Sequence, residues 1–553
     1  MLICRSLIVL IILSTQLVWP QAIAAVGLQP PSAEQTQYGV SMGTVTVMDE
    51  QLYRISLRPD IPLGKMGVAF DLELFIDENG DFSDRGWAFG GSTEVLDTIL
   101  RKIYYVRYGR PDDDAYVRVG ALDRVTLGYG LIVDGYRNTL HYPGVKKTGL
   151  EFGFRNVTSA GLSIEGMVNN LQDLSTGGGL VGFRVSAKTA GKLDVGLTYV
   201  VDMDQYGGLL DRDDDGFPDD VDAFPENGDR ALDNDRDGVA DEADADDDND
   251  GRIDVDAGSG LPEDVINTLE ELEASHGEEV FAVDRSVSRR SPFNKDLVGR
   301  DMFSIVGLDV GYPLVESGDT KLILYGQLAL MLDDEDELSA AAADSQGVTR
   351  GNRKAEGFGI MAPGLWLSAG PFEGRAEYRY FQDDFDAGYF DNLYELDRAR
   401  LDVATGKATP KDAELRRGES VHGLFGRIGT DLYGLVEAYA DYQHLVGSDD
   451  PKRQSHAAIS LSRKLLDTIP RLTIAEAYYQ KNNIGSRLDE DGTPGSEDDL
   501  FESTEDTFYG HRVGFGMANG VSLVWDTRYL FEREADGKLK RGKVMSIETV
   551  FSF

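Results

Sequence analysis

The stretch LKRGKVMSIETVFSF, residues 539–553, decides the fold class of this chain. Its side chains alternate between two faces. Met545, Ile547, Thr549, Phe551 and Phe553 lie on one face, and Val544, Ser546, Glu548, Val550 and Ser552 lie on the other. This period of two predicts a β-strand whose first face suits an apolar surrounding. A soluble edge strand is the weaker interpretation, because an exposed aromatic edge promotes aggregation.

The same alternation recurs in segments of about ten residues, the length that a tilted strand needs to cross a bilayer. In FEGRAEYRY, residues 372–380, Phe372 and Tyr378 alternate with Arg375 and Glu377. Similar segments are 66–76, 104–110, 116–121, 150–154, 162–168, 181–185, 193–201, 306–310, 322–332, 358–367, 436–442, 457–461, 472–479 and 521–531. A soluble sandwich rarely has so many strands, so the pattern favours a barrel with apolar side chains outside and polar ones inside.

Connection lengths support the barrel independently. The long connections are 203–300, 334–356, 383–419, 445–454, 482–506 and 534–539, and the short ones are 313–320, 369–371, 430–433, 464–470 and 518–520. The two classes alternate, as expected for long extracellular loops and short periplasmic turns. Eleven predicted strands follow residues 203–300, which places that insert outside the cell. About ten precede it, with an ambiguous stretch at 77–98 and residues 38–47 as a candidate strand outside the barrel.

With the terminal Phe553, this pattern resembles Gram-negative outer-membrane β-barrels, whose terminal aromatic residue is read by the assembly machinery. The resemblance implies contact with outer-membrane lipid and with that machinery. The N-terminus fits export, because a basic start at Arg5, an apolar run at 7–19 and the small-residue site Ala22-Ile23-Ala24 predict a signal peptide cleaved near Ala24 or Ala25. The only cysteine, Cys4, would leave with it, so no disulfide is expected.

The charge balance is strongly acidic. The chain has 54 Lys and Arg against 97 Asp and Glu, a formal net charge of −43. Nucleic acid is therefore excluded as a partner, and cations are the natural counterpart. Residues 211–256 alone contain 21 acidic and 4 basic residues.

Those acids repeat the pattern D-x-D-x-D-G-x-x-D-x-x-D. The first copy has Asp211, Asp213, Asp215, Asp219 and Asp222, the second has Asp233, Asp235, Asp237, Asp241 and Asp244, and the third has Asp246, Asp248, Asp250 and Asp254, with Asp256 or nothing at the last position. Glycine at the sixth position permits a sharp turn. Ca²⁺ takes six to eight oxygens at this EF-hand-like spacing, whereas Mg²⁺ requires a tighter octahedron. The alternative is a disordered acidic loop.

Helices of the EF-hand type do not flank the repeats, since Pro218 and Pro225 interrupt. With Phe224-Pro225, the region from about 204 to 256 resembles thrombospondin type-3 repeats, in which the chain wraps calcium ions with almost no apolar core. The resemblance implies Ca²⁺ as the cofactor and the repeated aspartates as its ligands, although the third copy departs at its last position. A further acidic stretch, 489–499, is either a cation site or a solvated loop. Residues 262–275 and 389–406 predict helices that fold over or into the barrel mouth.

No enzymatic motif emerges, because the chain has neither a G-x-S-x-G elbow nor an H-E-x-x-H zinc helix. His422, His444, His456 and His511 are expected at the outer rim. The charges predicted to face the lumen are Asp71, Glu73, Arg107, Arg118, Glu151, Arg155, Glu165, Arg184, Arg375, Glu377, Arg379, Glu437, Asp441, Asp526, Arg528 and Glu548. They either create a field across a water-filled pore or pair with one another and seal the barrel.

We therefore expect an all-β fold, an antiparallel transmembrane β-barrel of about 18–20 strands with a calcium-binding extracellular insert. The signal peptide occupies 1–25, the first half of the barrel 26–202, the insert 203–300 and the second half of the barrel 301–553. The expected function is that of a porin-like passive channel for small solutes, without enzymatic activity. The alternative is a surface adhesion or scaffold protein, in which a sealed barrel anchors a module that binds an extracellular ligand.

Overall fold

A computed structural model describes most of the chain after residue 36. The described residues are 37–47, 50–76, 82–83, 102–111, 113–122, 124–139, 146–158, 161–189, 192–225, 227–255, 261–277, 282–287, 292–333, 356–383, 385–402, 405–415, 420–447, 452–482, 484, 500–504, 507–518, 521–533 and 539–552. The predicted signal peptide, the acidic stretch 489–499 and Phe553 lie outside them and stay predictions.

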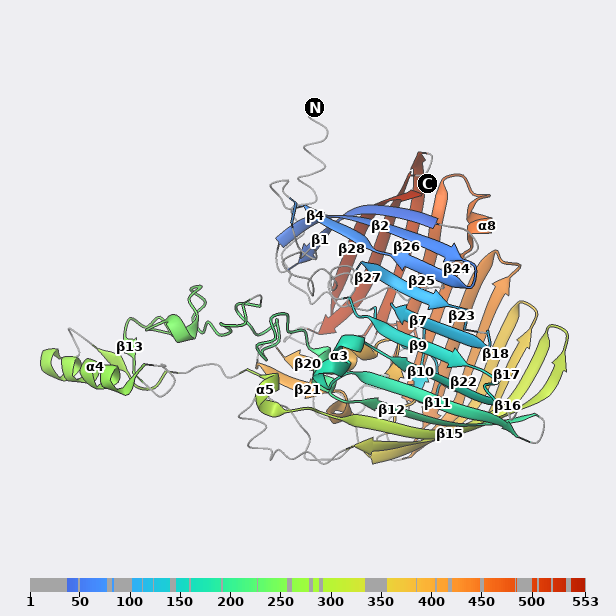
Figure 1. The fold of residues 1–553 in the computed structure, drawn as a ribbon, viewed down its shortest axis with the longest axis horizontal. Coiled ribbons are helices and arrows are strands. Elements are labelled where there is room, and N and C mark those ends of the chain that lie inside the picture. The colour runs from blue at the N-terminus through green and yellow to red at the C-terminus, as the bar shows by residue number, and fades with distance from the viewer. Residues whose placement is uncertain are drawn as a thin grey trace.

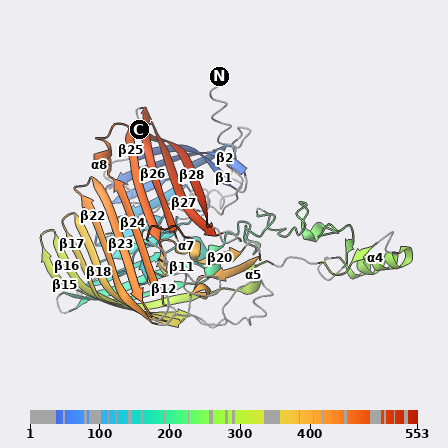
Figure 2. The same cartoon turned by 180° about the vertical axis from the view of Figure 1, so that it is seen from behind.

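One antiparallel sheet of 22 strands dominates the structure (Figures 1 and 2). Its strands are β1 (Gln37–Val47), β2 (Glu50–Leu63), β3 (Met66–Phe70), β4 (Leu72–Ile76), β5 (Phe82–Ser83), β6 (Ile103–Tyr108), β7 (Ala115–Gly120), β9 (Gly149–Phe154), β10 (Leu162–Val168), β11 (Leu180–Thr189), β12 (Leu193–Asp202), β15 (Phe303–Ser317), β16 (Thr320–Asp333), β17 (Glu356–Ala369), β18 (Phe372–Asp383), β22 (Val421–Leu432), β23 (Val436–Val446), β24 (Lys452–Leu461), β25 (Leu472–Lys481), β26 (Thr507–Ala518), β27 (Val521–Arg533) and β28 (Leu539–Ser552). Each segment predicted from alternation coincides with one or two of these strands.

The strand pairings close into a barrel. Neighbours along the chain pair antiparallel, and β28 pairs with β1 through the contact of Val40 with Phe551. Because β3 pairs with β6 while β4 pairs with β5, the strands β3 and β4 share one position in the circuit, and β5 and β6 share another. The described circuit thus has 20 positions, two fewer than its 22 strands. This count agrees with the predicted 18–20.

The strand count differs from the prediction in the first half of the barrel. Eleven strands follow the insert, as predicted, but nine positions rather than about ten precede it. The proposal that residues 38–47 lie outside the barrel is wrong, because β1 pairs along its whole length with β2 and also with β28. Glycines at 39 and 43 weaken the apolar–polar alternation in this segment. Its place in the barrel comes from pairing with the last strand, which the local sequence does not reveal.

The two faces of the barrel wall have opposite character. On β15, Leu308 is 53% exposed and Val310 is 46% exposed, whereas Asp309 between them is 2% exposed. The same inversion occurs on β18, where Tyr378 points outward and Glu377 is buried. The sequence alternation therefore places apolar side chains on the outside and charged ones on the inside, as predicted.

In the part of the chain that the structure describes, the helices and small sheets lie in the connections between barrel strands. They are α3 (Leu171–Thr176), η2 (Gln205–Gly208), η3 (Asp241–Ala243), α4 (Glu263–His276), α5 (Lys295–Val298), α7 (Tyr394–Asp397), η4 (Asp412–Glu414) and α8 (Arg463–Leu466), with strand pairs β8 (Val133–Asp134) and β19 (Phe390–Asp391), β13 (Ile253–Asp254) and β14 (Val283–Asp284), and β20 (Ala399–Asp402) and β21 (Lys407–Pro410). Among the described residues, no helix has the length and apolar character required to cross a membrane.

Two connections fold back onto the inner face of the barrel. We call residues 121–139 the first inward segment and residues 385–415 the second inward segment. Tyr129 stacks on Tyr325 of β16 with ring centroids 4.2 Å apart, and the amide of Leu131 donates to Oε1 of Gln327 at 2.9 Å. The two segments pair through β8 and β19 and share a buried apolar cluster with the inner face of β10 to β18. One side of the lumen is therefore packed with protein.

The insert leaves the barrel as a long arm (Figure 1). Helix α4 confirms the helix predicted at 262–275, but it lies at the distal end of this arm rather than over the barrel mouth. The second predicted helix, at 389–406, is largely wrong. Among the described residues of this range only α7 is helical, and β20 follows it at once, because Arg398 is used in a buried ion pair with the barrel wall.

Candidate functional site

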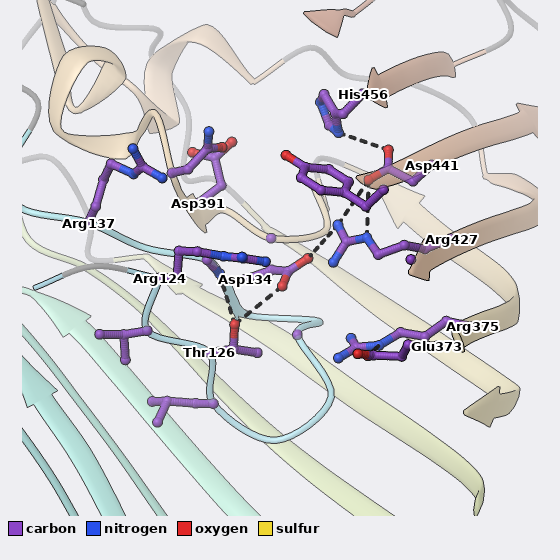
Figure 3. A pocket seen from close by; sticks show the side chains of 18 of the residues that line it. Arg124, Thr126, Asp134, Arg137, Glu373, Arg375, Asp391, Arg427, Asp441 and His456 are labelled. Carbon is purple, nitrogen blue, oxygen red and sulfur yellow. Dashed lines mark hydrogen bonds and ion pairs between the residues drawn. The ribbon is translucent and has the colours of Figure 1, made fainter. Parts of the chain in front are cut away.

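A cavity of about 1490 Å³ remains in the lumen, between the two inward segments and the barrel wall (Figure 3). Strands β6, β7, β9 and β10 form its wall on one side, and β17, β18, β22, β23, β24 and β25 form it on the other. The side chains around it are mostly polar or aromatic.

The cavity differs in charge from the chain as a whole. Its cationic residues are Arg107, Arg110, Arg118, Arg124, Arg137, Arg155, Arg375, Arg379, Lys411 and Arg427, and its acidic residues are Asp134, Glu151, Glu165, Glu373, Asp386, Asp391, Asp397, Asp431, Glu437 and Asp441. The signs balance here, although acids outnumber bases 97 to 54 in the chain. Arginine is thus concentrated around the cavity.

The charges predicted to face inward do so wherever their side chains are described. Nine line the cavity: Arg107, Arg118, Glu151, Arg155, Glu165, Arg375, Arg379, Glu437 and Asp441. Asp71, Arg184, Glu377 and Asp526 are buried, and Arg528 pairs with Asp526 at 2.7 Å. The side chains of Glu73 and Glu548 lie outside the description.

Many of these inner charges are paired. Arg184 donates from Nε and Nη2 to the two carboxylate oxygens of Asp309 at 2.8 and 2.6 Å, and from Nη1 to Glu165 at 2.8 Å. On β18, Arg379 donates to Glu377 through Nε and Nη2 and to Gln443 through Nη1. Such bidentate pairs satisfy buried charges and stiffen the wall rather than leave it open for solutes.

A second network lies on the cavity wall itself. Asp441 accepts from Arg427 at 3.1 Å and lies 2.9 Å from Nδ1 of His456, while Arg427 also reaches Asp134 of the first inward segment at 3.4 Å (Figure 3). His456, expected at the outer rim, therefore lies inside the lumen. The register that places it opposite Asp441 could not be obtained from the sequence of β24 alone.

Buried polar contacts fix the two inward segments to the wall. Glu395 accepts from Tyr136, from Asn169 at 3.3 Å and from Lys147 at 2.5 Å. Burial alone would raise the pKa of Glu395, but the charges of Lys147 and Arg398 outweigh it and hold this pKa at about 2. The carboxylate is therefore ionised at physiological pH, and it links the first inward segment, the second inward segment and the end of β10.

The acidic insert forms three separate carboxylate groups. Within each group the carboxylate oxygens lie within 4.8 Å of one another: Asp211, Asp213 and Asp215; Asp233, Asp235 and Asp237; and Asp246, Asp248 and Asp250. The structure thus brings together positions 1, 3 and 5 of each predicted repeat. The other predicted ligands, Asp219, Asp222, Asp241, Asp244 and Asp254, lie outside these groups.

The three repeats share one backbone conformation. The first aspartate of each accepts from the amide of the glycine at position 6, at 3.2, 2.9 and 2.9 Å. These glycines, at 216, 238 and 251, have φ of 92°, 93° and 85°, where a side chain is strained. Position 4 is also left-handed in each copy. The sequence repeat therefore encodes a structural repeat, which a random acidic loop would not.

The remaining predicted ligands have a different role in the loops. Asp219, Asp241 and Asp254 accept from the amide at position 2 of their own repeat, at 3.0, 2.8 and 2.8 Å. Asp222 accepts from Phe224, and its Oδ2 atom is buried without a hydrogen-bond partner. Burial raises the pKa of Asp222 to about 7, and the nearby charges of Asp213, Asp215 and Asp219 add to this effect. Both oxygens of Asp213 are likewise buried without hydrogen bonds.

This donor set fits a calcium ion best in the first repeat. The oxygens available are hard, several are buried without partners, and their close approach is repulsive without a cation. The first repeat also contacts the barrel side of the insert, because Lys295 lies 3.4 Å from Asp211 and its amide donates to the carbonyl of Gly216. The second and third repeats are more exposed.

Several residues of the site lie in connections where sequence reasoning did not place them. Arg124, Arg137, Asp391 and Lys411 line the cavity from the inward segments, and Arg398 anchors the second segment. Alternation identifies only residues on strands. The density of buried aromatics in 385–394 was the one available signal, since solvated loops seldom contain so many.

Comparisons with known proteins add little to this geometry. No family model and no curated protein matches the chain. Among solved structures, the FrpB iron transporter from Neisseria meningitidis (F5-1 variant) is similar with a TM-score of 0.35 and 7% identity, over 95% of this chain and 83% of that one. OccK5 (OpdH) from Pseudomonas aeruginosa gives 0.30 and 8%, over 94% and 97%. These values are too low to assign a family or a function.

Proposed function

We propose that this protein is an outer-membrane β-barrel that lets small solutes pass through its lumen and carries a calcium-organised extracellular arm. The observation that carries the proposal is the inverted wall, with exposed apolar side chains outside and charged side chains around a cavity inside. In a soluble protein this arrangement would be unstable, whereas a bilayer stabilises it.

The outward residues support a membrane location. Large apolar side chains at least 36% exposed recur on successive strands: Leu308, Val310, Leu324, Leu328, Leu330, Leu332, Leu365, Leu367, Leu424, Ile428, Ile459 and Phe515. Contiguous exposed apolar surface of this extent requires a covering partner. Outer-membrane lipid is the natural partner for a closed antiparallel barrel, with delivery by the assembly machinery through β28 and export by the predicted signal peptide.

The cavity supports passage of solutes. A barrel of this size is wide enough for an aqueous channel unless something plugs it, and the inward segments fill only part of the lumen. The opposite faces of the remaining space carry arginines, tyrosines and carboxylates, which suit hydrated polar solutes. We propose no enzymatic role.

Calcium binding by the arm rests on the repeated loops. Oxygens of positions 1, 3 and 5 converge in every copy, and unpartnered buried oxygens occur in the first. Asp211, Asp213, Asp215 and Asp222 would hold the first ion, with the corresponding residues of the other copies holding further ions. The ion would neutralise the carboxylates and keep the arm ordered, as in the thrombospondin type-3-like interpretation of the sequence.

Conductance tests the channel. The refolded full-length protein is inserted into a planar bilayer and currents are recorded in calcium and again in chelator. A stable open current in calcium supports the channel, and its absence in both conditions contradicts it. A reduction only in chelator would show that the arm acts on the pore.

One observation favours the second candidate, a sealed barrel that anchors a surface module. The buried apolar cluster packs the inward segments against half of the wall, as expected for a plug. In that case the calcium arm would be the working part and an extracellular macromolecule its partner. Absence of current, combined with calcium-dependent binding of barrel-bearing vesicles to a surface, would establish this alternative.

A further inference from the structure

The strongest unassigned feature is a cation in the lumen that the wall does not neutralise. Arg124 lines the cavity from the first inward segment, and within the described chain no hydrogen bond or ion pair engages its guanidinium (Figure 3). Its φ of 65° is left-handed, which is unfavourable for a residue with a side chain.

Its surroundings contain further arginines and a hydrogen-bond donor. Tyr439 on β23 also lines the cavity. Arg124, Arg427 and Arg137 act electrostatically on its hydroxyl group, and so does the carboxylate of Asp441. Three guanidinium groups from two different elements therefore act on one position. No hydrogen bond to the Tyr439 hydroxyl occurs among the described residues.

The described acids nearest to Arg124 are paired with other groups. Asp441 is paired with Arg427 and His456, and Asp134 accepts from Thr126 at 3.4 Å and faces Arg427 at the same distance. Arg427 is thus shared between two carboxylates, whereas Arg124 is paired with neither of them. A guanidinium group offers two parallel N–H donors, the geometry that a carboxylate or a phosphate matches.

We propose that Arg124 and the hydroxyl of Tyr439 form a binding site for the oxyanion group, carboxylate or phosphate, of a small polar solute that passes through the lumen. The inference rests on the proposed channel function and deepens it by naming the class of solute. Arg137 and Arg427 line the same cavity, and the tyrosines of its wall can contact the body of the solute.

The test compares three solutes of similar size. The wild-type protein is reconstituted into proteoliposomes. The rates at which glucose, gluconate and glucose 6-phosphate enter these vesicles are then measured. We expect the concentration that gives half of the maximal entry rate to be lower for gluconate or for glucose 6-phosphate than for glucose. The solute with the lowest such concentration identifies the oxyanion, carboxylate or phosphate, that the site prefers. Arg124→Gln should raise that concentration about tenfold, the effect of losing a charged hydrogen bond, and Tyr439→Phe should raise it less.

Arg471→Gln is the matched control. Arg471 is exposed, lies away from the cavity and has a φ of 67°, so the same substitution meets the same backbone conformation. Folding of each variant is verified by far-ultraviolet circular dichroism. Equal behaviour of the three solutes in the wild type, or equal behaviour of Arg124→Gln and Arg471→Gln, would overturn the inference.

Failure of the channel itself is separable from failure of the site. If no solute enters and no current flows, the proposed function is contradicted, and titration calorimetry of gluconate and glucose 6-phosphate into the detergent-solubilised protein then decides the site. Binding that disappears in Arg124→Gln but persists in Arg471→Gln supports it. No binding to the wild type overturns it.

Discussion

Arg398 and Asp202 form a fully buried bidentate ion pair, in which Nε and Nη2 of the arginine donate to Oδ2 and Oδ1 of the aspartate, both at 2.5 Å. Asp202 is the last residue of β12, where the insert leaves the barrel, and Arg398 follows α7 in the second inward segment. Tyr394 donates to the same carboxylate at 2.7 Å. The base of the arm and the segment inside the lumen are therefore joined by one charge pair.

Asp202→Asn should release the second inward segment. The substitution leaves the guanidinium buried without its counter-charge, which costs about 3–5 kcal/mol. We expect a lower unfolding temperature, faster proteolysis within residues 385–415 and, if the pore conducts, a larger current. Asp467→Asn, at an exposed turn, is the control. Equal protease resistance of both variants would show that the pair does not hold the segment, and Asp202→Leu combined with Arg398→Met should restore stability.

Removal of calcium should unfold the arm but not the barrel. Chelator leaves the converging carboxylates uncompensated, so we expect protease cleavage within residues 211–255 while the barrel stays intact. Asp235→Asn should remove about one calcium ion from the stoichiometry measured by titration calorimetry, because it disrupts only the second group. Asp229→Asn, an exposed acid between the groups, should bind as the wild type does. Unchanged stoichiometry in Asp235→Asn would argue against this site.

The second inward segment should respond to pH through Asp391. Burial raises the pKa of Asp391 from 3.8 to about 6, opposed by the charge of Lys411 and reinforced by Asp397 and Asp386. Because the folded protein holds this proton more tightly, its stabilising effect is complete below pH 3.8 and is lost as the pH rises through 6. Asp391→Asn should flatten the dependence of the unfolding temperature between pH 4 and 6 relative to the wild type. Parallel curves for the two proteins would contradict this assignment.

The outer face should not tolerate charge. Leu308→Arg places a cation on the apolar surface of β15 and should cost about 2–4 kcal/mol if this residue lies near the bilayer centre. The fraction folded into lipid vesicles during urea titration measures the effect. Val265→Arg on α4, similarly a partly exposed apolar position but in the arm, is the control and should leave the transition unchanged. Equal transitions would place Leu308 outside the membrane.

The strands and their faces could be predicted because alternation is a local property. Leu308, Asp309 and Val310 reveal their directions from three consecutive letters. The inward segments could not be predicted this way, because their packing depends on partners such as Gln327 for Leu131, 196 residues away. The helix expected at 389–406 failed for the same reason, since the pairing of Arg398 with Asp202 prevails over local propensity.

In the insert, by contrast, the local sequence determines much of the structure. Its repeat specifies the loop conformation locally, so the grouping of positions 1, 3 and 5 could be predicted, and the arrangement of Asp211, Asp213 and Asp215 agrees with it. The role of Asp219 could not be predicted, because a carboxylate that accepts from a backbone amide and one that holds a cation look the same in sequence. Calcium itself stays a prediction.

The pairing of β8 with β19 determines where a solute could pass through the barrel. The two inward segments pair with each other and make apolar contacts with β10 to β18 and with the ends of β22 and β23, so the open passage lies off the barrel axis. A passing molecule would contact the inner faces of β6 to β10 and of β17, β18 and β22 to β25, with the inward segments on its other side. Substitutions of residues that line this passage should alter permeation. Substitutions in the apolar cluster between the inward segments and the wall should alter only the stability of the barrel.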